Sequence, residues 1–399
     1  MDVLDTLIAR GFIKSHTDLD ALRSAMNAGA LSFYVGFDPT GDSLHIGHLL
    51  PVMAMAHLQQ GGHKPIVVLG GGTAMVGDPS GKDKTREILT PERIRSNLES
   101  MRVQFGRFLD LDGCEVVDNA EWLMGLGYIQ FLRDVGKHFS VNKMMSAEGI
   151  KQRLDRNQGL SFIEFNYHLL QSYDFLVLHD RFGCTLQLGG DDQWFNILGG
   201  VELIRRERQQ AAHALTIPLL QTADGKKMGK TEKGATWLDP NQCSPYDYFQ
   251  YWVNVHDADV GRFLRLYTFL PIEEIEALEA LEGAQIREAK QVLALEATRL
   301  AHGDEEAQRA QEAARAAFSG GVSVDMPTHG VAFPLSIVDA LVATGLCKSK
   351  GDARRQIQQG AVRLGADRDQ QVSATDIVLE GETVLWKGKK NCFRLVSAS

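Results

Sequence analysis

The stretch FYVGFDPTGDSLHIGHLL, residues 33–50, indicates the fold around which the chain is organised. Its first five residues are aromatic, β-branched or glycine, a composition typical of a short buried strand. A turn containing a proline and a glycine follows, and then an apolar segment with a helical pattern. Pro51 is tolerated only near the start of a helix, so we expect this helix to begin close to Gly47. A strand, a turn and a helix in this order form the repeating unit of parallel sheets.

The same alternation continues through the first half of the chain. Further strand-like runs occupy residues 65–69, 115–117 and 185–188. Between them, residues 90–109 have a helical pattern, with Thr90 as a candidate N-cap and Pro91 suited to the first helical position. Alternating strands and helices predict a Rossmann-like α/β domain, in which ligands bind at the carboxyl ends of the parallel strands.

The second half has a different character. Residues after about 245 are strongly helix-forming, and Gly320–Gly321 ends that run. The end of the chain combines a helical pattern with several strand-like runs, as in a small α+β module. We therefore expect an α/β domain over residues 1–230, a helical domain over 231–320, a linker over 321–332 and a C-terminal domain over 333–399.

Charge and cysteine usage narrow the classes of protein that fit. The formal net charge of the chain is -9, yet Ala332 to Ser399 carry 10 Lys and Arg against 7 Asp and Glu. A basic end on an acidic body suggests nucleic acid as a partner there, although a solvated charged surface fits equally well. The five cysteines lack metal-ligand spacing, which predicts free thiols in a cytoplasmic protein with no bound metal. We expect neither a signal peptide nor contact with a membrane.

The tetrapeptide His45-Ile46-Gly47-His48 lies where the first turn meets its helix. Two imidazoles at the positive end of a helix are well placed to meet phosphate groups. Gly47 has no side chain, so a planar base has room to lie against its backbone. We interpret this segment as a nucleotide site; the alternative is an ordinary helix cap with two surface histidines.

A second cluster of charged residues is Lys227-Met228-Gly229-Lys230-Thr231. Two lysines three residues apart on a flexible loop are able to close over a departing pyrophosphate, since lysine acts as a movable point charge. Taken alone this signal is weak, because lysine-rich loops are usually only solvated. GGGTAMVGDPSGK does not match a phosphate-binding loop either, because Asp83 stands where Ser or Thr is needed.

Together the two signatures resemble the HIGH and KMSKS motifs of class I aminoacyl-tRNA synthetases. YVGFDPTGDSLHIGHL, GDPSGK, FLRDVGKHFSVN, QLGGDDQW and KMGKT are similar to the tyrosyl-tRNA synthetases of bacteria. The resemblance implies a homodimer, with an inserted dimerisation segment, that uses L-tyrosine, ATP with Mg²⁺ and tRNA(Tyr). Gly229 and Thr231 depart from the family's loop motif, which has serine at both positions.

One helical pattern tests this resemblance independently. Tyr167, Gln171 and Asp174 fall at i, i+4 and i+7, so they share one face of an otherwise apolar helix and need polar partners or solvent. By resemblance, Asp174 and Tyr34 hydrogen-bond the substrate phenol. The remaining tyrosine-binding residues implied by the family are Asp78, Tyr167 and Gln171 at the ammonium group and Gln193 near the carboxylate.

The resemblance also implies residues for ATP and for RNA. Implied catalytic contacts come from Thr40, His45, His48, Lys82, Lys227 and Lys230, and ATP-binding contacts from Gly36, Asp38, Gly47, Gly190, Asp192 and Lys230. The end of the chain resembles the RNA-binding domain of ribosomal small-subunit protein four. Its candidate RNA-binding residues are Lys348, Lys350, Arg354, Arg355, Arg363, Lys387, Lys389 and Lys390.

Three other interpretations remain open. A tryptophanyl-tRNA synthetase shares both signatures but lacks the pairing of Tyr34 with Asp174. A small-molecule adenylyltransferase also carries a HIGH motif, but has no need of an RNA-binding domain. An RNA-binding regulator with a degenerate catalytic body is a third possibility, against which the intact motifs argue.

Overall fold

The computed structural model describes residues 2–78, 90–157, 159–223, 225, 228, 230–231, 234–319, 327–365, 368–388 and 391–397. Its first part is built on a parallel five-stranded sheet with the order β3-β2-β1-β4-β5. These strands are β1 (Ser32–Phe37), β2 (Lys64–Leu69), β3 (Glu115–Asp118), β4 (Cys184–Gly190) and β5 (His213–Ile217). The predicted α/β architecture is confirmed. Chain order reverses between β1 and β4, and in such sheets ligands bind at that point.

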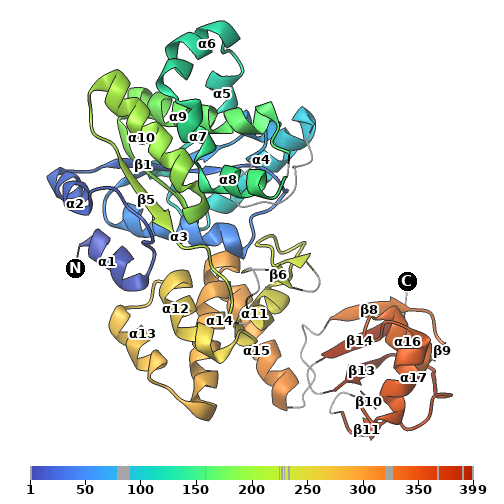
Figure 1. Cartoon of the computed structure of the whole chain (residues 1–399). Coiled ribbons are helices and arrows are strands. Elements are labelled where there is room, and N and C mark those ends of the chain that lie inside the picture. Colours follow the sequence, from blue (N-terminus) through green and yellow to red (C-terminus); the bar gives the residue numbers. More distant parts are fainter. Residues whose placement is uncertain are drawn as a thin grey trace.

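Helices cover both faces of this sheet (Figure 1). One face packs against α1 (Val3–Arg10), α2 (Leu19–Ala28), α3 (Ile46–Gln60) and α4 (Pro91–Phe105), and the other against α5 (Ala120–Leu123), α9 (Phe162–Phe182) and α10 (Trp194–Arg208). Successive side chains of a strand point to opposite faces. Phe33 and Val35 of β1 therefore join the core under α3, whereas Tyr34 faces α9.

The helices α3, α4 and α9 begin where their sequences direct. α3 begins at Ile46 and α4 at Pro91, in agreement with the sequence, and the hydroxyl of Thr90 accepts a hydrogen bond from the Arg93 amide at 3.3 Å. α9 opens with a capping box formed by Ser161 and Glu164. This capping box fixes the residue at which α9 begins.

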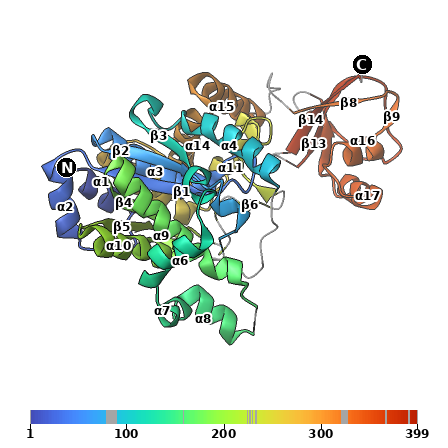
Figure 2. The ribbon, with the colours of Figure 1, turned by 90° about the horizontal axis from the view of Figure 1, so that it is seen from above.

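A group of short helices leaves the sheet domain between β3 and α9. It consists of α6 (Tyr128–Asp134), the 3₁₀ turn η3 (Gly136–His138), α7 (Val141–Met145) and α8 (Glu148–Asp155). In the view from above, α7 and α8 stand away from the sheet (Figure 2). Other 3₁₀ turns are η1 (Thr73–Met75), η2 (Leu111–Gly113), η4 (Asp191–Gln193), η5 (Asp257–Asp259) and η6 (Gly283–Gln285).

The helical region follows a short hairpin of β6 (Lys230–Thr231) and β7 (Gly234–Ala235). It contains α11 (Pro245–Val253), α12 (Val260–Tyr267), α13 (Ile272–Glu279), α14 (Ile286–His302) and α15 (Asp304–Ser319). Trp252 and Phe263 belong to the same apolar core as the α3 face of the sheet. The Arg10 guanidinium also donates to the Thr268 carbonyl at 2.8 Å. The helical region is therefore packed firmly against the sheet domain.

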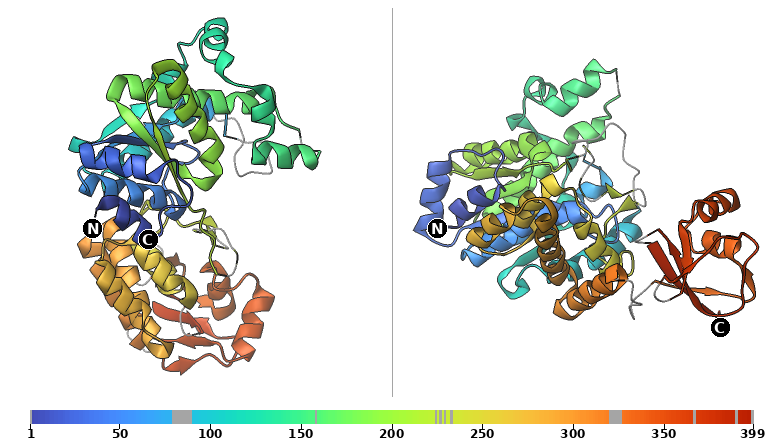
Figure 3. Two further views of the ribbon diagram at one scale, coloured as in Figure 1. Left: turned by 60° about the vertical axis from the view of Figure 1, so that its left-hand side comes forward. Right: turned by 90° about the horizontal axis from the view of Figure 1, so that it is seen from below.

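The C-terminal module has a mixed five-stranded sheet with the order β11-β10-β13-β14-β8 and its own apolar core. Its elements are β8 (Thr328–Val331), β9 (Leu335–Ser336), α16 (Ile337–Ala343), α17 (Lys350–Gln358), β10 (Val362–Leu364), β11 (Gln370–Gln371), β12 (Val378–Leu379), β13 (Thr383–Lys387) and β14 (Asn391–Ser397). Thr328–Val331 had been expected in a linker, but this strand pairs in parallel with β14. Both views of Figure 3 show the module (red) beside the helical region and apart from the short helices α6–α8.

Candidate active site

A cavity of about 260 Å³ lies at the carboxyl ends of β1 and β4, where the strand order reverses. Side chains from both strands and from α9 line it, as the sequence predicted for ligands of a parallel sheet. The predicted residues that line it are Tyr34, Gly36, Asp38, Thr40, His48, Asp78, Tyr167, Gln171, Asp174, Gly190, Asp192 and Gln193. The polar stripe on α9 therefore faces the cavity and not solvent.

Tyr34 forms part of the deep end of this cavity. Its ring lies edge-on to Phe175 of α9 at 5.2 Å, and the residue is only 1% exposed. Its hydroxyl oxygen is buried and has no hydrogen-bond partner within the described residues. Burial raises the pKa of Tyr34 well above its ordinary value, so the hydroxyl keeps its proton. A buried hydroxyl without a partner is costly, and a polar substrate group would relieve that cost.

Asp174 of α9 is the second polar group at this end. Its Oδ1 accepts from the Trp122 indole Nε1 at 2.7 Å, and its Oδ2 accepts from Asn119 Nδ2 at 3.0 Å. Burial raises the pKa of Asp174 to about 7, although these two hydrogen bonds favour the charged form. The carboxylate is thus oriented by two donors and retains lone pairs for a third.

Asn119 and Trp122, which hold Asp174, are site residues that the sequence patterns did not predict. Asn119 directly follows β3, so its place at the carboxyl end of a strand was the available signal. Its own amide is held in turn, because its Oδ1 accepts from the Gly72 backbone at 2.8 Å and its Nδ2 donates to Thr73 Oγ1 at 3.0 Å.

Carboxylates gather at the wider end of the cavity. Asp38 accepts from the Tyr167 hydroxyl at 3.2 Å, and Asp78 Oδ2 accepts from Gln193 Nε2 at 2.9 Å. Burial and the nearby charge of Asp78 raise the pKa of Asp192. This end is therefore suited to a cation such as an ammonium group. Asp191, in contrast, accepts hydrogen bonds from the Ser15 and Thr216 hydroxyls, which gives it a structural role.

His45 and His48 form the entrance side at the start of α3. His45 is the N-cap: its Nδ1 accepts from the Gly47 amide at 3.0 Å, and His48 Nδ1 accepts from the His45 amide at 3.4 Å. The rings stack with centroids 3.8 Å apart. Because Nδ1 accepts in both rings, each neutral imidazole carries its proton on Nε2. His45 is thus a helix cap, and His48 also lines the cavity.

Gly47 is required by this cap as well. An added Cβ at this position would lie 2.8 Å from Cε1 of His45, closer than side chains approach one another. The room that the sequence analysis assigned to a base beside Gly47 is therefore bordered by the His45 ring.

The first signature segment pairs with the stretch that follows the second one in the chain. The Ile46 amide donates to the Thr236 carbonyl at 3.1 Å, and the Leu238 amide donates to the Leu44 carbonyl at 2.9 Å. The β6–β7 hairpin, which begins at Lys230, directly precedes this pairing. Lys82 and Lys227 lie outside the described residues, and for Lys230 only the backbone is described.

The candidate RNA-binding residues of the C-terminal module lie in a different setting. Lys348, just before α17, and Lys350, Arg354 and Arg355 within it are exposed, whereas Arg363 and Lys387 are partly buried. Several of them are engaged within the module, since Lys350 pairs with Asp339 at 2.6 Å and Arg355 with Asp352 at 2.7 Å. Arg363 and Lys387 donate to backbone carbonyls. Lys389 and Lys390 fall outside the described residues.

Over the described ranges of the chain, no helix is long and apolar enough to cross a membrane. In the same part of the chain, no three His, Cys, Asp or Glu side chains converge as they would around a metal ion.

Two family models match this chain and together cover most of it. Residues 26–319 match the family of tRNA synthetases class I (W and Y), and residues 318–395 match the tyrosine–tRNA ligase SYY-like C-terminal domain. The fold and the site thus define a class I tRNA synthetase of the tryptophan and tyrosine group.

Individual relatives narrow the group further. Tyrosine–tRNA ligase 1 of Clostridium acetobutylicum is 49% identical over 405 residues, covering 99% of each chain, and tyrosine–tRNA ligase of Acetivibrio thermocellus is 50% identical over 405 residues, covering 98% of each. A C-terminally truncated mitochondrial tyrosyl-tRNA synthetase of Aspergillus nidulans has a TM-score of 0.70 at 30% identity, over 79% of this chain and 93% of that one. The chain belongs to the tyrosine–tRNA ligase family.

Proposed function

We propose that this chain activates L-tyrosine with ATP, forming tyrosyl-adenylate and pyrophosphate, and then transfers the tyrosyl group to the 3'-terminal adenosine of tRNA(Tyr). The observation that carries this proposal is the deep end of the cavity. There the buried Tyr34 hydroxyl lacks a partner among the described residues, and Asp174 is held by two donors. A substrate phenol satisfies both groups, whereas phenylalanine leaves the Tyr34 hydroxyl without a partner and Asp174 without its third donor, at a cost. An indole, as in a tryptophanyl enzyme, has no hydroxyl to offer them.

The other end of the cavity fits the rest of the amino acid. Asp78, Tyr167 and Gln171 would hold the ammonium group, and Gln193 would lie near the carboxylate. The nearby carboxylates of Asp38 and Asp78 support this orientation, because they favour a cation at this end. The substrate carboxylate then points toward the start of α3, where the α-phosphorus of ATP must lie for attack.

Placement and charge stabilisation would supply the catalysis, because neither transfer requires a protein nucleophile. Thr40 and the Nε2–H groups of His45 and His48 would contact the phosphates and ribose, with Gly36, Asp38, Gly47, Gly190 and Asp192 completing the ATP site. Lys82, Lys227 and Lys230 would neutralise charge on the departing pyrophosphate. Mg²⁺ would accompany ATP, coordinated mainly by phosphate oxygens and water, the ligands that this ion commonly retains.

The helical region and the C-terminal module would hold the tRNA. A groove of about 700 Å³ between α11, α14 and α15 supports a role at the anticodon side, since Asn254, Arg287 and Arg315 line it. The C-terminal module, which we propose to be of the ribosomal small-subunit protein four type, would contribute the exposed cations of α17. Contacts of this kind with phosphates are strongly salt-dependent.

A homodimer is the assembly that we propose, with residues between β3 and α9 as the dimerisation segment. Large apolar side chains are exposed along this segment, including Met124 at 63%, Tyr128 at 60% and Ile129 at 75%. A second copy would remove this apolar surface from water. The proposed domains are a catalytic domain over 1–230, a helical domain over 231–320 and a C-terminal domain that includes β8. The cytoplasmic location remains a prediction.

Amino-acid-dependent ATP–pyrophosphate exchange tests the proposed function. Exchange should depend on L-tyrosine and should be far weaker with L-phenylalanine or L-tryptophan. Exchange that is strongest with L-tryptophan, or that is absent with L-tyrosine, would reject the assignment. Charging of tRNA(Tyr) by the same preparation then tests the second step.

A further inference from the structure

The back of α9 carries a histidine that points away from the tyrosine cavity. His168 follows Tyr167 in the chain and is 8% exposed. Its ring stacks on Phe195 of α10 with centroids 4.2 Å apart and lies edge-on to Phe139 at 5.2 Å. Gly199 leaves just enough room for it, because an added Cβ there would be 2.4 Å from Cε1 of the ring. The imidazole is therefore held tightly between α9 and α10.

A continuous series of hydrogen bonds joins this ring to the tyrosine cavity. His168 Nδ1 lies 3.3 Å from Asn196 Oδ1, and Asn196 Nδ2 donates to Gln193 Oε1 at 3.1 Å. Gln193 Nε2 then donates to Asp78 Oδ2 at 2.9 Å. Each amide accepts at its oxygen and donates at its nitrogen, so the imidazole Nδ1 must carry a proton.

We propose that His168 and Asn196 are positioning residues for tyrosine binding, which orient Gln193 and thereby aim the Asp78 carboxylate at the substrate ammonium. This inference rests on the proposed role of Asp78 in binding tyrosine. Neither residue lines the cavity, so both act through Gln193. Without the Asn196 donor, the Gln193 side-chain amide is free to rotate. Its oxygen would then face the Asp78 carboxylate, and two hydrogen-bond acceptors would lie against each other.

The protonation state of His168 is consistent with this role. Burial, assisted by the charge of Lys143, lowers the pKa of His168 to about 4, so the ring is neutral at physiological pH. A neutral ring carries one proton, and the Asn196 oxygen fixes that proton on Nδ1.

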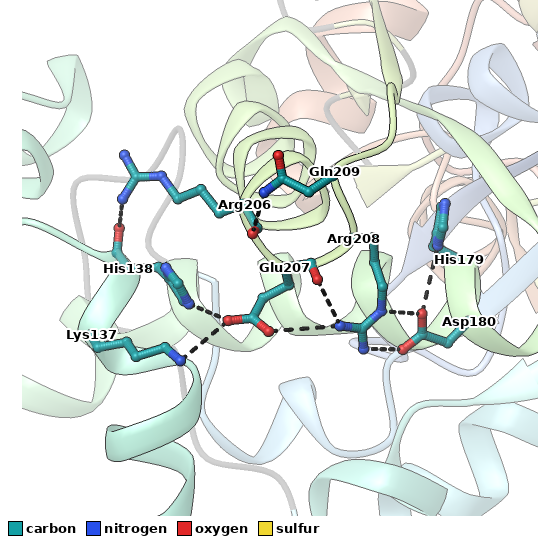
Figure 4. Close-up of polar contacts among 8 residues, drawn as sticks. All are labelled: Lys137, His138, His179, Asp180, Arg206, Glu207, Arg208 and Gln209. Atoms are coloured by element: carbon teal, nitrogen blue, oxygen red, sulfur yellow. Dashed lines mark hydrogen bonds and ion pairs between the residues drawn. The ribbon is translucent and has the colours of Figure 1, made fainter.

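Polar contacts at the surface fix the segment that supplies Phe139 (Figure 4). Glu207 of α10 contacts His138 and lies 3.3 Å from Lys137 Nζ, and Arg206 donates to the His138 carbonyl at 3.0 Å. Exposed pairs of this kind contribute little individually. Together they hold η3 against α10, and so they keep Phe139 against the His168 ring.

Two substitutions of the same residue test the proposal. His168→Leu removes the donor to Asn196, whereas His168→Asn offers an N–H close to the position of Nδ1. We expect His168→Leu to weaken L-tyrosine binding and raise the tyrosine KM about five- to tenfold, the weight of one hydrogen bond. His168→Asn should restore most of that loss, and the KM for ATP should stay within about twofold of wild type in both variants.

Ligand analogues separate positioning from a general structural role. Tyramine has the ammonium group but no carboxylate, and 3-(4-hydroxyphenyl)propionate has the carboxylate but no ammonium group. His168→Leu should weaken binding of tyramine, whose ammonium group would meet Asp78, clearly more than binding of the propionate, whose carboxylate would lie near Gln193 alone. Phe139→Leu is a matched control, because it alters packing on the same ring without removing a hydrogen bond; it should lower Tm and leave tyramine binding intact.

Equal losses for both analogues, or no loss for either, would overturn the proposal. Failure of His168→Asn to differ from His168→Leu in tyramine binding would also overturn it. Failure of the wild-type chain to bind L-tyrosine would instead reject the proposed function, so the two failures are distinguishable.

Discussion

The tyrosine cavity and the surface of the C-terminal module place their polar groups in opposite ways. In the cavity, Asp174 is 4% exposed and receives hydrogen bonds from two buried donors. On the module, the side chains of Lys350 and Arg355 are 64% and 65% exposed and pair with neighbouring carboxylates. The cavity holds a few polar groups in fixed positions away from water, whereas the module exposes many charged groups to water.

This difference follows from what each region would recognise. A small molecule is distinguished by one hydroxyl, so the discriminating groups must be desolvated and oriented before it arrives. A tRNA offers many phosphates, and exposed cations meet them through interactions that salt screens. Single substitutions should therefore be severe in the cavity and mild on the module.

Removal of the whole module should give the largest effect. A chain ending at Ser319 should lose charging of tRNA(Tyr) by at least about 10³-fold, because the phosphate contacts are lost together. Its tyrosine-dependent ATP–pyrophosphate exchange should stay within about twofold of the full chain, since the cavity lies entirely in the sheet domain. Measurable charging by this truncated chain at normal tRNA concentrations would contradict the proposed role of the module.

Asp174→Ala tests the cavity with one residue. We expect kcat/KM for L-tyrosine in the exchange assay to fall by about 10³-fold, because the indole of Trp122 and the amide of Asn119 lose their acceptor as well. The kcat/KM for L-phenylalanine provides the control and should change much less. A parallel fall for both amino acids would show that the substitution damaged the fold rather than recognition of the phenol.

Lys230→Ala should affect rate rather than binding. Lys230 starts β6, beside the segment that pairs with the start of α3. If this lysine acts on the departing pyrophosphate, kcat should fall about 10²-fold while the tyrosine KM changes by less than about threefold. An increase in the tyrosine KM with an unchanged kcat would assign it to substrate binding instead.

The pH dependence of tyrosine use should reflect Asp174. Its pKa is raised to about 7, so the group is protonated below that pH and ionised above it. Since the carboxylate accepts from the phenol, kcat/KM for tyrosine should rise severalfold from pH 6 to pH 8. Trp122→Phe removes a donor that favours the charged form, so it should move the midpoint upward. An unmoved midpoint would attribute the profile to another group.

The smallest effect should come from one exposed cation of the module. Arg354→Ala removes a single candidate phosphate contact, and we expect the KM for tRNA(Tyr) to rise about two- to fivefold at moderate salt. The difference from wild type should shrink as salt concentration increases. A loss comparable to that of Asp174→Ala would show that the module uses a specific, desolvated contact.

Local patterns predicted the elements that carry the cavity. The strand at Phe33–Phe37, the start of α3 and the common face of Tyr167, Gln171 and Asp174 follow from periodicity and helix caps. The donors to Asp174 did not, because Asn119 and Trp122 are more than fifty residues away and their contacts depend on tertiary packing. β8 was missed for a similar reason, since it is stabilised by pairing with the end of the chain.

The two donors behind Asp174 limit how this pocket could be re-engineered for other amino acids. An apolar residue at position 174, chosen to admit a hydrophobic substrate, would strand the indole N–H of Trp122 and the amide of Asn119 in a dry environment. A successful redesign must therefore exchange positions 119, 122 and 174 as a set. Libraries that vary only the residues in contact with the substrate would therefore leave out the changes needed in the donors behind position 174.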